Sequence, residues 1–246
     1  ELLAMRETAA GADGLLAAID ALSARLREQA GESLRDIRGS PGLEQVSTSS
    51  MAALRAYSRG WQIQSRDGGN APAADLFREA IRHDSTFAMA HRSLAAMLSN
   101  MGVNRREEIA ARIKAYEHRD RLGDRERLHV EGAYHFGVTG DPERGRRAFE
   151  ELVERFPDDA DAYNYLGLIS TDDEERLDLF QRAASIHFRD VYFNNLLHTL
   201  VRLGRNDSAA AVAANYARTA PDQWVARGAA AYAAMLTLDF VRADSL

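Results

Sequence analysis

Apolar residues recur along this chain at helical spacing, and the segments that carry them come in pairs separated by a short turn. The stretch Val191–Pro221 shows one complete pair, which ends at the proline. When Phe193 is counted as position 4, the patterned positions 7, 11, 15, 20, 24 and 27 are Leu196, Leu200, Gly204, Ala209, Ala213 and Tyr216. This spacing predicts two antiparallel helices that pack against each other across small residues.

The same frame repeats with starts near residues 54, 88, 126, 160, 190 and 224. Successive starts differ by 34, 38, 34, 30 and 34 residues, and three of these intervals match the tetratricopeptide repeat (TPR) period of roughly 34. We attribute the long interval to about four extra residues near Val103–Glu108, and the short one to about four missing residues near Ser170–Glu175. The pattern predicts an all-α fold, a right-handed TPR superhelix (α-solenoid) of about five to six helical hairpins over residues 50–246.

Small residues are expected at positions 8 and 20, where the two helices of a hairpin cross. Trp61 falls at position 8 of the first repeat, and Gly145 falls at position 20 of the third. We therefore expect a locally splayed hairpin around Trp61 and a looser one around Gly145. Pro157 closes the third repeat because proline cannot continue a helix, and the aspartates after it favour the start of the next helix.

Residues 1–49 precede the repeats and carry a different pattern. Four apolar residues share one face of a predicted amphipathic helix, namely Leu15, Ile19, Leu22 and Leu26. Pro41 and Gly42 then predict an extended linker. We interpret this segment as an N-terminal helical cap over the open end of the solenoid, because the terminal repeats of such arrays need a polar covering element. A dimerisation helix is the alternative.

Four stretches together resemble the C-terminal TPR region of bacterial serine/threonine protein kinases: Ala18–Gly60, Phe87–Gly102, Ala115–Phe136 and Arg155–Gly167. In those proteins a kinase domain is followed by a membrane segment or linker and then by such repeats. The resemblance implies the regulatory or sensory tail of a bacterial kinase, periplasmic if a membrane segment precedes the repeats and otherwise cytoplasmic. The alternative is a free-standing extrinsic subunit that holds a larger assembly, such as a membrane complex, together.

Composition narrows the classes of function. The net charge is −6 and Lys114 is the only lysine, so no basic excess indicates a nucleic-acid partner. The chain contains no cysteine, which excludes disulfides, thiolate nucleophiles and cysteine-ligated zinc. The longest uncharged runs are too short to cross a bilayer. We attribute the dominance of arginine to a GC-rich genome.

The chain lacks the residue patterns of the common catalytic sites. His118–Asp120 reads HRD as in a kinase catalytic loop, but Arg125 stands where that loop needs an asparagine. His129 and His135 lie six residues apart, which places them on divergent helix faces and away from the spacing of helical metal ligands. We therefore predict no enzymatic activity, no cofactor and no metal site.

The predicted binding surface is the concave side of the solenoid, which the first helix of each hairpin lines through positions 2, 5, 9 and 12. The residues at these positions that we assign to partner binding are Arg92, Arg127, Tyr134, Asn164, Asn194 and His198. They combine arginine with aromatic and amide groups, a mixture found at interfaces, but ordinary solvated helix positions are polar as well. None is a lysine, which argues against the lysine clamp by which chaperone-binding TPR proteins hold a terminal carboxylate.

The expected function is a non-catalytic protein–protein interaction scaffold that binds a protein or peptide partner. The last repeat adds a second expected contact, because it stops inside its second helix at Leu246. Its large apolar residues are Trp224, Tyr232, Met235, Leu236 and Phe240. We expect this surface to be covered by more of the same chain or by another subunit, since soluble monomers rarely leave such patches open.

Overall fold

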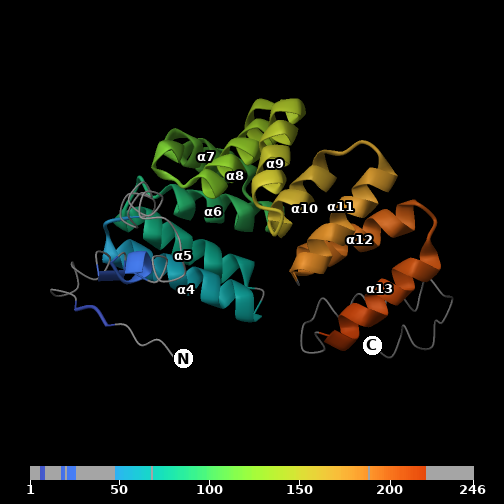
Figure 1. The fold of residues 1–246 in the computed structure, drawn as a ribbon, viewed down its shortest axis with the longest axis horizontal. Helices are drawn as coiled ribbons and strands as arrows, with labels where there is room; N and C mark the ends of the chain where they lie inside the picture. The colour runs from blue at the N-terminus through green and yellow to red at the C-terminus, as the bar shows by residue number, and fades with distance from the viewer. Residues whose placement is uncertain are drawn as a thin grey trace. The chain divides into compact units, whose positions relative to one another are not determined.

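A computed structural model describes residues 6–8, 18–19, 21–25, 48–67, 69–187 and 189–219 of the 246-residue chain. Every regular element within these ranges is helical. The chain divides into two compact units, Glu1–Tyr134 and His135–Leu246, and the ribbon in Figure 1 shows the helices of each unit paired into hairpins. The all-α prediction is therefore confirmed.

The first unit contains two complete helical hairpins and the start of a third repeat. Hairpin 1 pairs α4 (Met51–Asp67) with α5 (Asn70–His83), and hairpin 2 pairs α6 (Ala88–Met101) with α7 (Arg105–Glu117). A 3₁₀ turn, η1 (Arg119–Arg121), then leads into α8 (Asp124–Tyr134). These helices begin within about three residues of the predicted repeat starts at 54, 88 and 126, a spread that boundary assignment alone produces.

The second unit opens with a π-helical segment, η2 (His135–Thr139), followed by α9 (Pro142–Arg155). Two hairpins follow: α10 (Ala160–Ile169) with α11 (Asp173–Ile186), and α12 (Asp190–Arg202) with α13 (Asn206–Thr219). The hairpins start at the predicted residues 160 and 190. The sixth repeat, most of the N-terminal cap and its linker lie outside the described residues. Residues 18–19 and 21–25, inside the predicted N-terminal helix, are helical.

Turn and junction residues act as the sequence predicts. Gly102 and Gly204 stand at the turns between paired helices and Gly140 stands between η2 and α9, with φ of 63°, 70° and 67°, a left-handed conformation that glycine adopts without a Cβ penalty. At the junction, α9 ends at Arg155, before Pro157. The Asp159 carboxylate then accepts the backbone N–H of Ala162 at 3.0 Å and caps α10.

The extra residues of the second repeat lie in a different place from the one predicted. Only three residues separate α6 from α7, so the turn near Val103–Glu108 has ordinary length. The insertion instead follows α7, where residues 118–123 connect α7 to α8 and include the 3₁₀ turn η1. This turn is anchored to the preceding junction, because the Arg121 guanidinium donates to the hydroxyl of Thr86. The HRD sequence is therefore part of a structural connection.

The predicted splay around Trp61 is wrong. Gly60, one residue earlier, is the crossing residue of hairpin 1: a Cβ added there would lie 2.7 Å from Cε1 of Phe77. Trp61 is rotated onto the neighbouring face of α4, where it packs against the side of Phe77 with ring centroids 5.7 Å apart. The two helices approach closely because glycine removes the side chain at the crossing.

The same glycine–phenylalanine crossing occurs in the second unit at Gly167, which stands at position 8 of the repeat that starts at Ala160. A Cβ at Gly167 would lie 2.5 Å from Cε1 of Phe180, which is 2% exposed. Gly145 at position 20 of the third repeat is buried on α9. Because α8 and α9 belong to different units, the looser hairpin expected around Gly145 stays a prediction.

Hairpin 2 departs from its neighbours in the chemistry of its core. Counted from the start of each second helix, Ala73 and Phe77 of α5 correspond to Glu108 and Arg112 of α7. Both charged residues are buried, with 4% and 7% of their surface exposed, and Arg112 Nη2 lies 2.9 Å from Glu108 Oε1. Arg112 also donates to the backbone carbonyl of Ala133 at 3.2 Å, which ties α7 to α8.

Candidate functional site

The six predicted partner-binding residues all lie on first helices or at their ends, but they are divided between the two units. The first unit holds Arg92, Arg127 and Tyr134, and the second holds Asn164, Asn194 and His198. His198 is exposed, Asn164 is buried, and the other four are half-buried. The candidate surface is therefore described separately in each unit.

Asn164 is not a surface residue. It is 6% exposed, and its Oδ1 accepts a hydrogen bond from Asn195 Nδ2 at 2.8 Å. This bond joins the first helices of two successive hairpins, α10 and α12, inside the second unit. Asn164 thus contributes to the stacking of successive hairpins. Its position in the repeat did not predict this role, because the repeat position does not specify which residue of the next hairpin faces Asn164.

Arg127 and Tyr134 belong to a polar and aromatic cluster on α7, η1 and α8. Tyr134 stacks on Tyr116 with centroids 3.9 Å apart and an interplanar angle of 12°. The Arg119 guanidinium lies 3.9 Å from the Tyr116 ring centroid and pairs with Glu131 at 3.4 Å. The cluster forms a stack of one guanidinium and two tyrosine rings.

The charge of Arg127 is neutralised along its own helix. Its guanidinium contacts Asp124 at 3.2 Å and Glu131 at 3.2 Å. The hydrogen bond to Asp124, followed by the charge of Glu131, raises the pKa of Arg127 despite the opposing effect of burial. Arg127 therefore holds the side chains of Asp124 and Glu131 on the surface of α8. It is a weaker candidate for pairing with a partner than its sequence position suggests.

A second set of first-helix residues in this unit lies on α4 and α6, and we call it the Trp61 strip. It comprises Tyr57, Trp61, Met89, Arg92 and Ala96, all half-buried. Tyr57 and Met89 pack against one core cluster, and Trp61 and Ala96 pack against the next. Only Arg92 of this set was predicted from the sequence, because the repeat frame placed Trp61 at the helix crossing. The adjacent Gly60 was the signal that would have corrected the frame.

The rings of the Trp61 strip are supported from beneath by buried aromatic residues. Tyr57 lies 5.6 Å from Phe77 and 5.0 Å from Phe87 between ring centroids, and Phe77 and Phe87 are 0% and 1% exposed. Tilted aromatic pairs at such distances are favourable beyond the apolar area that they bury. The strip is therefore a half-exposed apolar surface on a packed aromatic core.

In the second unit, the first helices present what we call the Leu168 row: Leu168, Asn194 and His198. Leu168 on α10 and His198 on α12 stand at the same position of successive repeats, 30 residues apart in the sequence. Leu168 is 42% exposed, His198 is exposed and Asn194 is half-buried. Asn194 and His198 were predicted from the sequence, but Leu168 was not, since a leucine at helical spacing is usually a core residue.

A partly buried polar junction joins the two helices that carry this row. The Asp161 carboxylate of α10 accepts a hydrogen bond from the Tyr192 hydroxyl at 2.6 Å and forms an ion pair with Arg189 at 2.9 Å. Burial, and next the charge of Asp161, raises the pKa of the Tyr192 phenol, so it remains a hydrogen-bond donor at neutral pH. These contacts hold the starts of α10 and α12 in register.

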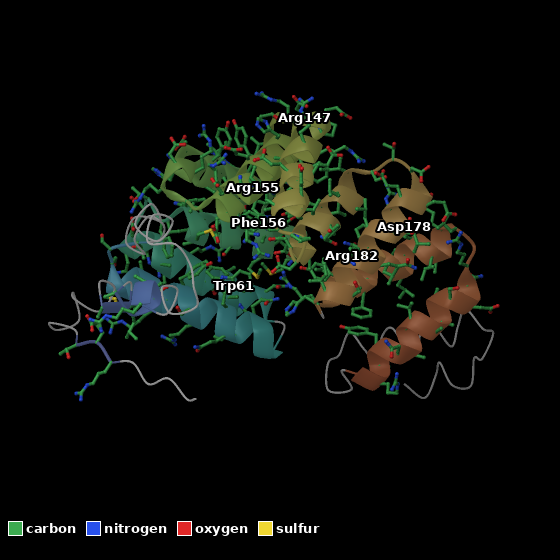
Figure 2. All side chains as sticks on the ribbon, in the orientation of Figure 1. Trp61, Arg147, Arg155, Phe156, Asp178 and Arg182 are labelled. Atoms are coloured by element: carbon green, nitrogen blue, oxygen red, sulfur yellow. The ribbon has the colours of Figure 1, made fainter. Side chains whose placement is uncertain are left out.

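The second helices of this unit carry exposed side chains of other kinds. In Figure 2 the labelled Arg147 and Asp178 lie on α9 and α11, and both are exposed. Arg182, near the end of α11, has its guanidinium carbon 5.7 Å from the Tyr163 ring centroid. Arg147 and Asp178 are suitable reference positions, because they belong to the second helices and lie outside the Leu168 row.

The described part of the chain shows no group of three or more residues that could hold a metal ion. His129 is buried on α8, whereas His135 begins the π-helical segment of the other unit. None of the described helices has the length and apolar character needed to span a membrane.

The comparisons with known proteins show the fold. No family model matches the sequence, and no curated protein matches it. The structure is similar to a thermophilic TPR protein from Thermus thermophilus, with a TM-score of 0.58 and 17% identity over 75% of this chain and 100% of that chain. The chain folds into TPR hairpins. PilW, a type IV pilus biogenesis factor, is also similar, with a TM-score of 0.51 and 13% identity over 79% of this chain and 90% of that chain.

Proposed function

We propose that this TPR protein is a non-catalytic scaffold whose first-helix surfaces bind a segment of a partner protein. The observation that carries the proposal is the Leu168 row. A leucine 42% exposed and an exposed histidine occupy equivalent places on successive hairpins, whose first helices are joined by a partly buried polar junction. Apolar area beside hydrogen-bonding groups is the mixture of contacts that protein interfaces use.

The row also offers the chemistry that a peptide backbone requires. Asn194 supplies both donors and an acceptor, and the His198 imidazole adds two ring nitrogens that can take part in hydrogen bonds. Leu168 supplies apolar area beside them. An extended segment lying across α10 and α12 could therefore satisfy its N–H and C=O groups while burying an apolar side chain on Leu168.

Site-specific photocrosslinking in native extract tests this proposal. A photoreactive amino acid is placed at His198, and the same amino acid at Asp178 on the second helix serves as the matched control. We expect a discrete crosslinked partner from position 198 and none from position 178. Leu168→Asp should then reduce the crosslink from position 198 by about tenfold, because burial of a carboxylate costs well above the 1.4 kcal/mol that a tenfold change in affinity requires.

Equal crosslinking from positions 198 and 178, or a crosslink from position 198 that Leu168→Asp leaves unchanged, would contradict the proposal. Circular dichroism of each variant checks that the helices are intact. The change at position 168 is at an exposed site, so a shift in the free energy of unfolding within about 0.5 kcal/mol is expected.

Whether the scaffold is the tail of a kinase or a separate subunit is a second hypothesis. The resemblance to the repeat region of bacterial serine/threonine kinases supports a regulatory tail, with a periplasmic location if a membrane segment precedes the repeats. A separate reading frame would support the extrinsic assembly subunit instead. Reading the gene on both sides of this sequence decides between the two, since only the first places a kinase domain upstream in the same frame.

A further inference from the structure

A buried histidine lies where hairpin 2 begins. His91, in the first turn of α6, is 7% exposed, and its Nε2 lies 2.9 Å from the backbone carbonyl oxygen of Ser85. Ser85 belongs to residues 84–87, which connect α5 to α6 and which we call the 84–87 junction. A carbonyl oxygen only accepts hydrogen bonds, so Nε2 carries the proton of the neutral imidazole and donates it. His91 therefore ties α6 to the segment that joins the two hairpins.

The 84–87 junction is held by segments on both sides of it. The Asp84 carboxylate accepts hydrogen bonds from the hydroxyl groups of Thr48, which precedes hairpin 1, and of Thr86, at 2.5 Å and 2.7 Å. Arg121, in the connection that follows hairpin 2, donates to the Thr86 hydroxyl. Phe87 is 1% exposed and packs in the core between α4, α5 and α6. A change in the contact with His91 therefore acts where the packing of hairpin 1 on hairpin 2 is decided.

The charged groups that act on His91 come from the junction and from the end of α7. The charges of His118 and Lys114 oppose a positive charge on the imidazole, whereas the charge of Asp84 favours it. Asp84 already accepts the two threonine hydroxyls. The other carboxylate that interacts with His91 is Glu117, which pairs with Lys114 at 2.6 Å. Both carboxylates are thus engaged, and a protonated His91 would face two cations from α7 and its C-terminal cap.

Protonation of His91 is therefore unfavourable while the junction is closed. Burial is the largest cause that lowers its pKa from the ordinary 6.5, and the charge of His118 adds to this effect against the opposing hydrogen bond to Ser85. A protonated imidazole also brings a second N–H donor into the buried site. When the junction opens, water solvates the charge, so the open state takes up the proton at higher pH than the closed state. The stability of the closed junction is therefore complete above pH 6.5 and falls as the pH drops from there to the closed-state value.

We propose that His91 is a pH sensor of the first unit, and that uptake of a proton by its imidazole releases the 84–87 junction from α6 and loosens hairpin 1 from hairpin 2. The Trp61 strip extends over both hairpins, with Tyr57 and Trp61 on α4 and with Met89 and Arg92 on either side of His91 along α6. Acidification therefore alters a first-helix surface of the first unit. This inference goes beyond the scaffold function and does not depend on which partner the scaffold binds.

Hydrogen exchange of single amides on the full chain, followed by NMR from about pH 7.5 to about pH 5, tests the inference. The informative amides are those of Ala90 and His91, which donate to the Phe87 carbonyl at 3.1 Å and 3.2 Å. After correction for the intrinsic pH dependence of exchange, their opening constant should rise by up to about tenfold per pH unit below 6.5 and then level off. Amides of α10 in the second unit serve as the internal reference and should show no such rise.

Variants assign the response to one imidazole. His91→Gln keeps an N–H donor for the Ser85 carbonyl but cannot take up a proton, so the rise should disappear. The matched control is His83→Gln, at an exposed position at the end of α5, which should keep the response of the parent. His118→Gln removes one opposing charge and should narrow the pH range of the rise without abolishing it. Direct titration of the imidazole signals in the parent keeps the test valid if His91→Gln loses its fold, because His91 should take up its proton below pH 6.5.

Three results would overturn the inference. The first is an opening constant of the Ala90 and His91 amides that is independent of pH over this range. The second is an unchanged rise in His91→Gln, or a rise that only His118→Gln abolishes, which would move the sensor to another histidine. The third is an imidazole of His91 that takes up its proton at or above pH 6.5 in the parent. The crosslink from position 198 at neutral pH tests the scaffold function separately, so failure of one does not entail failure of the other.

Discussion

The buried ion pair of α7 should dominate the stability of hairpin 2. The Arg112 and Glu108 side chains are 8% and 5% exposed and lie 2.9 Å apart. Arg112→Met removes one charge and leaves Glu108 with Arg105, which approaches it at 2.8 Å from a 60% exposed position. Breaking a buried pair in this way costs about 3–5 kcal/mol, because the remaining charge stays in a poorly solvated site.

The double variant Glu108→Leu with Arg112→Met should recover most of that loss. Replacement of a whole buried pair by apolar residues of similar volume is neutral or stabilising by about 1–4 kcal/mol. The double variant also loses the hydrogen bond that Arg112 donates to the Ala133 carbonyl at 3.2 Å. A buried acceptor left without its donor costs about 1–3 kcal/mol, which opposes the gain. The two contributions nearly cancel, so the double variant should lie within about 2 kcal/mol of the parent.

The pair also predicts a dependence on pH. Burial on its own raises the pKa of the Glu108 carboxyl, but the hydrogen bond from Arg105 and the charge of Arg112 outweigh it, and the net effect lowers that pKa below its usual 4.5. A carboxyl whose pKa is lower in the folded state stabilises the fold above pH 4.5 and loses that contribution as pH falls through the folded value. The parent should therefore lose more stability on acidification than the double variant.

Hydrogen exchange of the α7 backbone amides is the appropriate assay, because repeat arrays open hairpin by hairpin and one global midpoint averages over them. Urea unfolding followed by circular dichroism gives the second measurement. The reasoning would be refuted if Arg112→Met lowered the stability of α7 by less than about 1 kcal/mol, the value expected of a solvent-screened surface pair. A double variant as unstable as the single one would refute the role assigned to the isolated charge.

Two further predictions concern the second unit. Gly167→Ala should lower the free energy of unfolding by about 1–3 kcal/mol, because the new Cβ overlaps the buried Phe180 ring. Urea titration checks this, and a second change, Phe180→Leu, should restore part of the loss. Asn195→Ala should cost about 1–3 kcal/mol because it leaves the buried Asn164 amide without its donor. The neighbouring Asn194→Ala, at a half-buried position, is the control and should cost clearly less; equal losses would contradict the placement of Asn164.

The parts of the fold that could be predicted from the sequence are those set by local geometry. Glycines at the turns, Pro157 at the junction and the alternation of small and large residues along paired helices depend only on backbone conformation and helix spacing. The starts of α6, α10 and α12 accordingly agree with the predicted repeat boundaries at 88, 160 and 190. The close crossing at Gly167 was predictable for the same reason.

The features that escaped prediction depend on contacts between residues distant in sequence. Gly60 and Trp61 both fit the helical repeat frame at the crossing position. Only the contact with Phe77 shows that Gly60 is the crossing residue, and Trp61, one residue later, therefore lies on the half-buried surface of α4. Glu108 and Arg112 look like surface residues on α7, and only their mutual pairing makes their burial tolerable. Asn164 occupies a nominal surface position, but Asn195 of the next hairpin covers it. For the candidate site, composition and repeat position identified His198 and Arg92 but missed Leu168 and Trp61.

Polar side chains at the junctions hold successive hairpins in register, and this arrangement leaves the first-helix surfaces free to vary. In the first unit, the Asp84 carboxylate accepts hydrogen bonds from the hydroxyl groups of Thr48 and Thr86, and Arg121 donates a hydrogen bond to Thr86. This short chain of hydrogen bonds links three consecutive repeat boundaries. In the second unit the carboxylate of Asp161 plays the corresponding part. These residues lie at or near helix starts and in loops, whereas the Trp61 strip and the Leu168 row lie mainly along the helices. A substitution at the exposed Leu168 or His198 therefore changes the chemistry offered to a partner without breaking the polar contacts that set the stack.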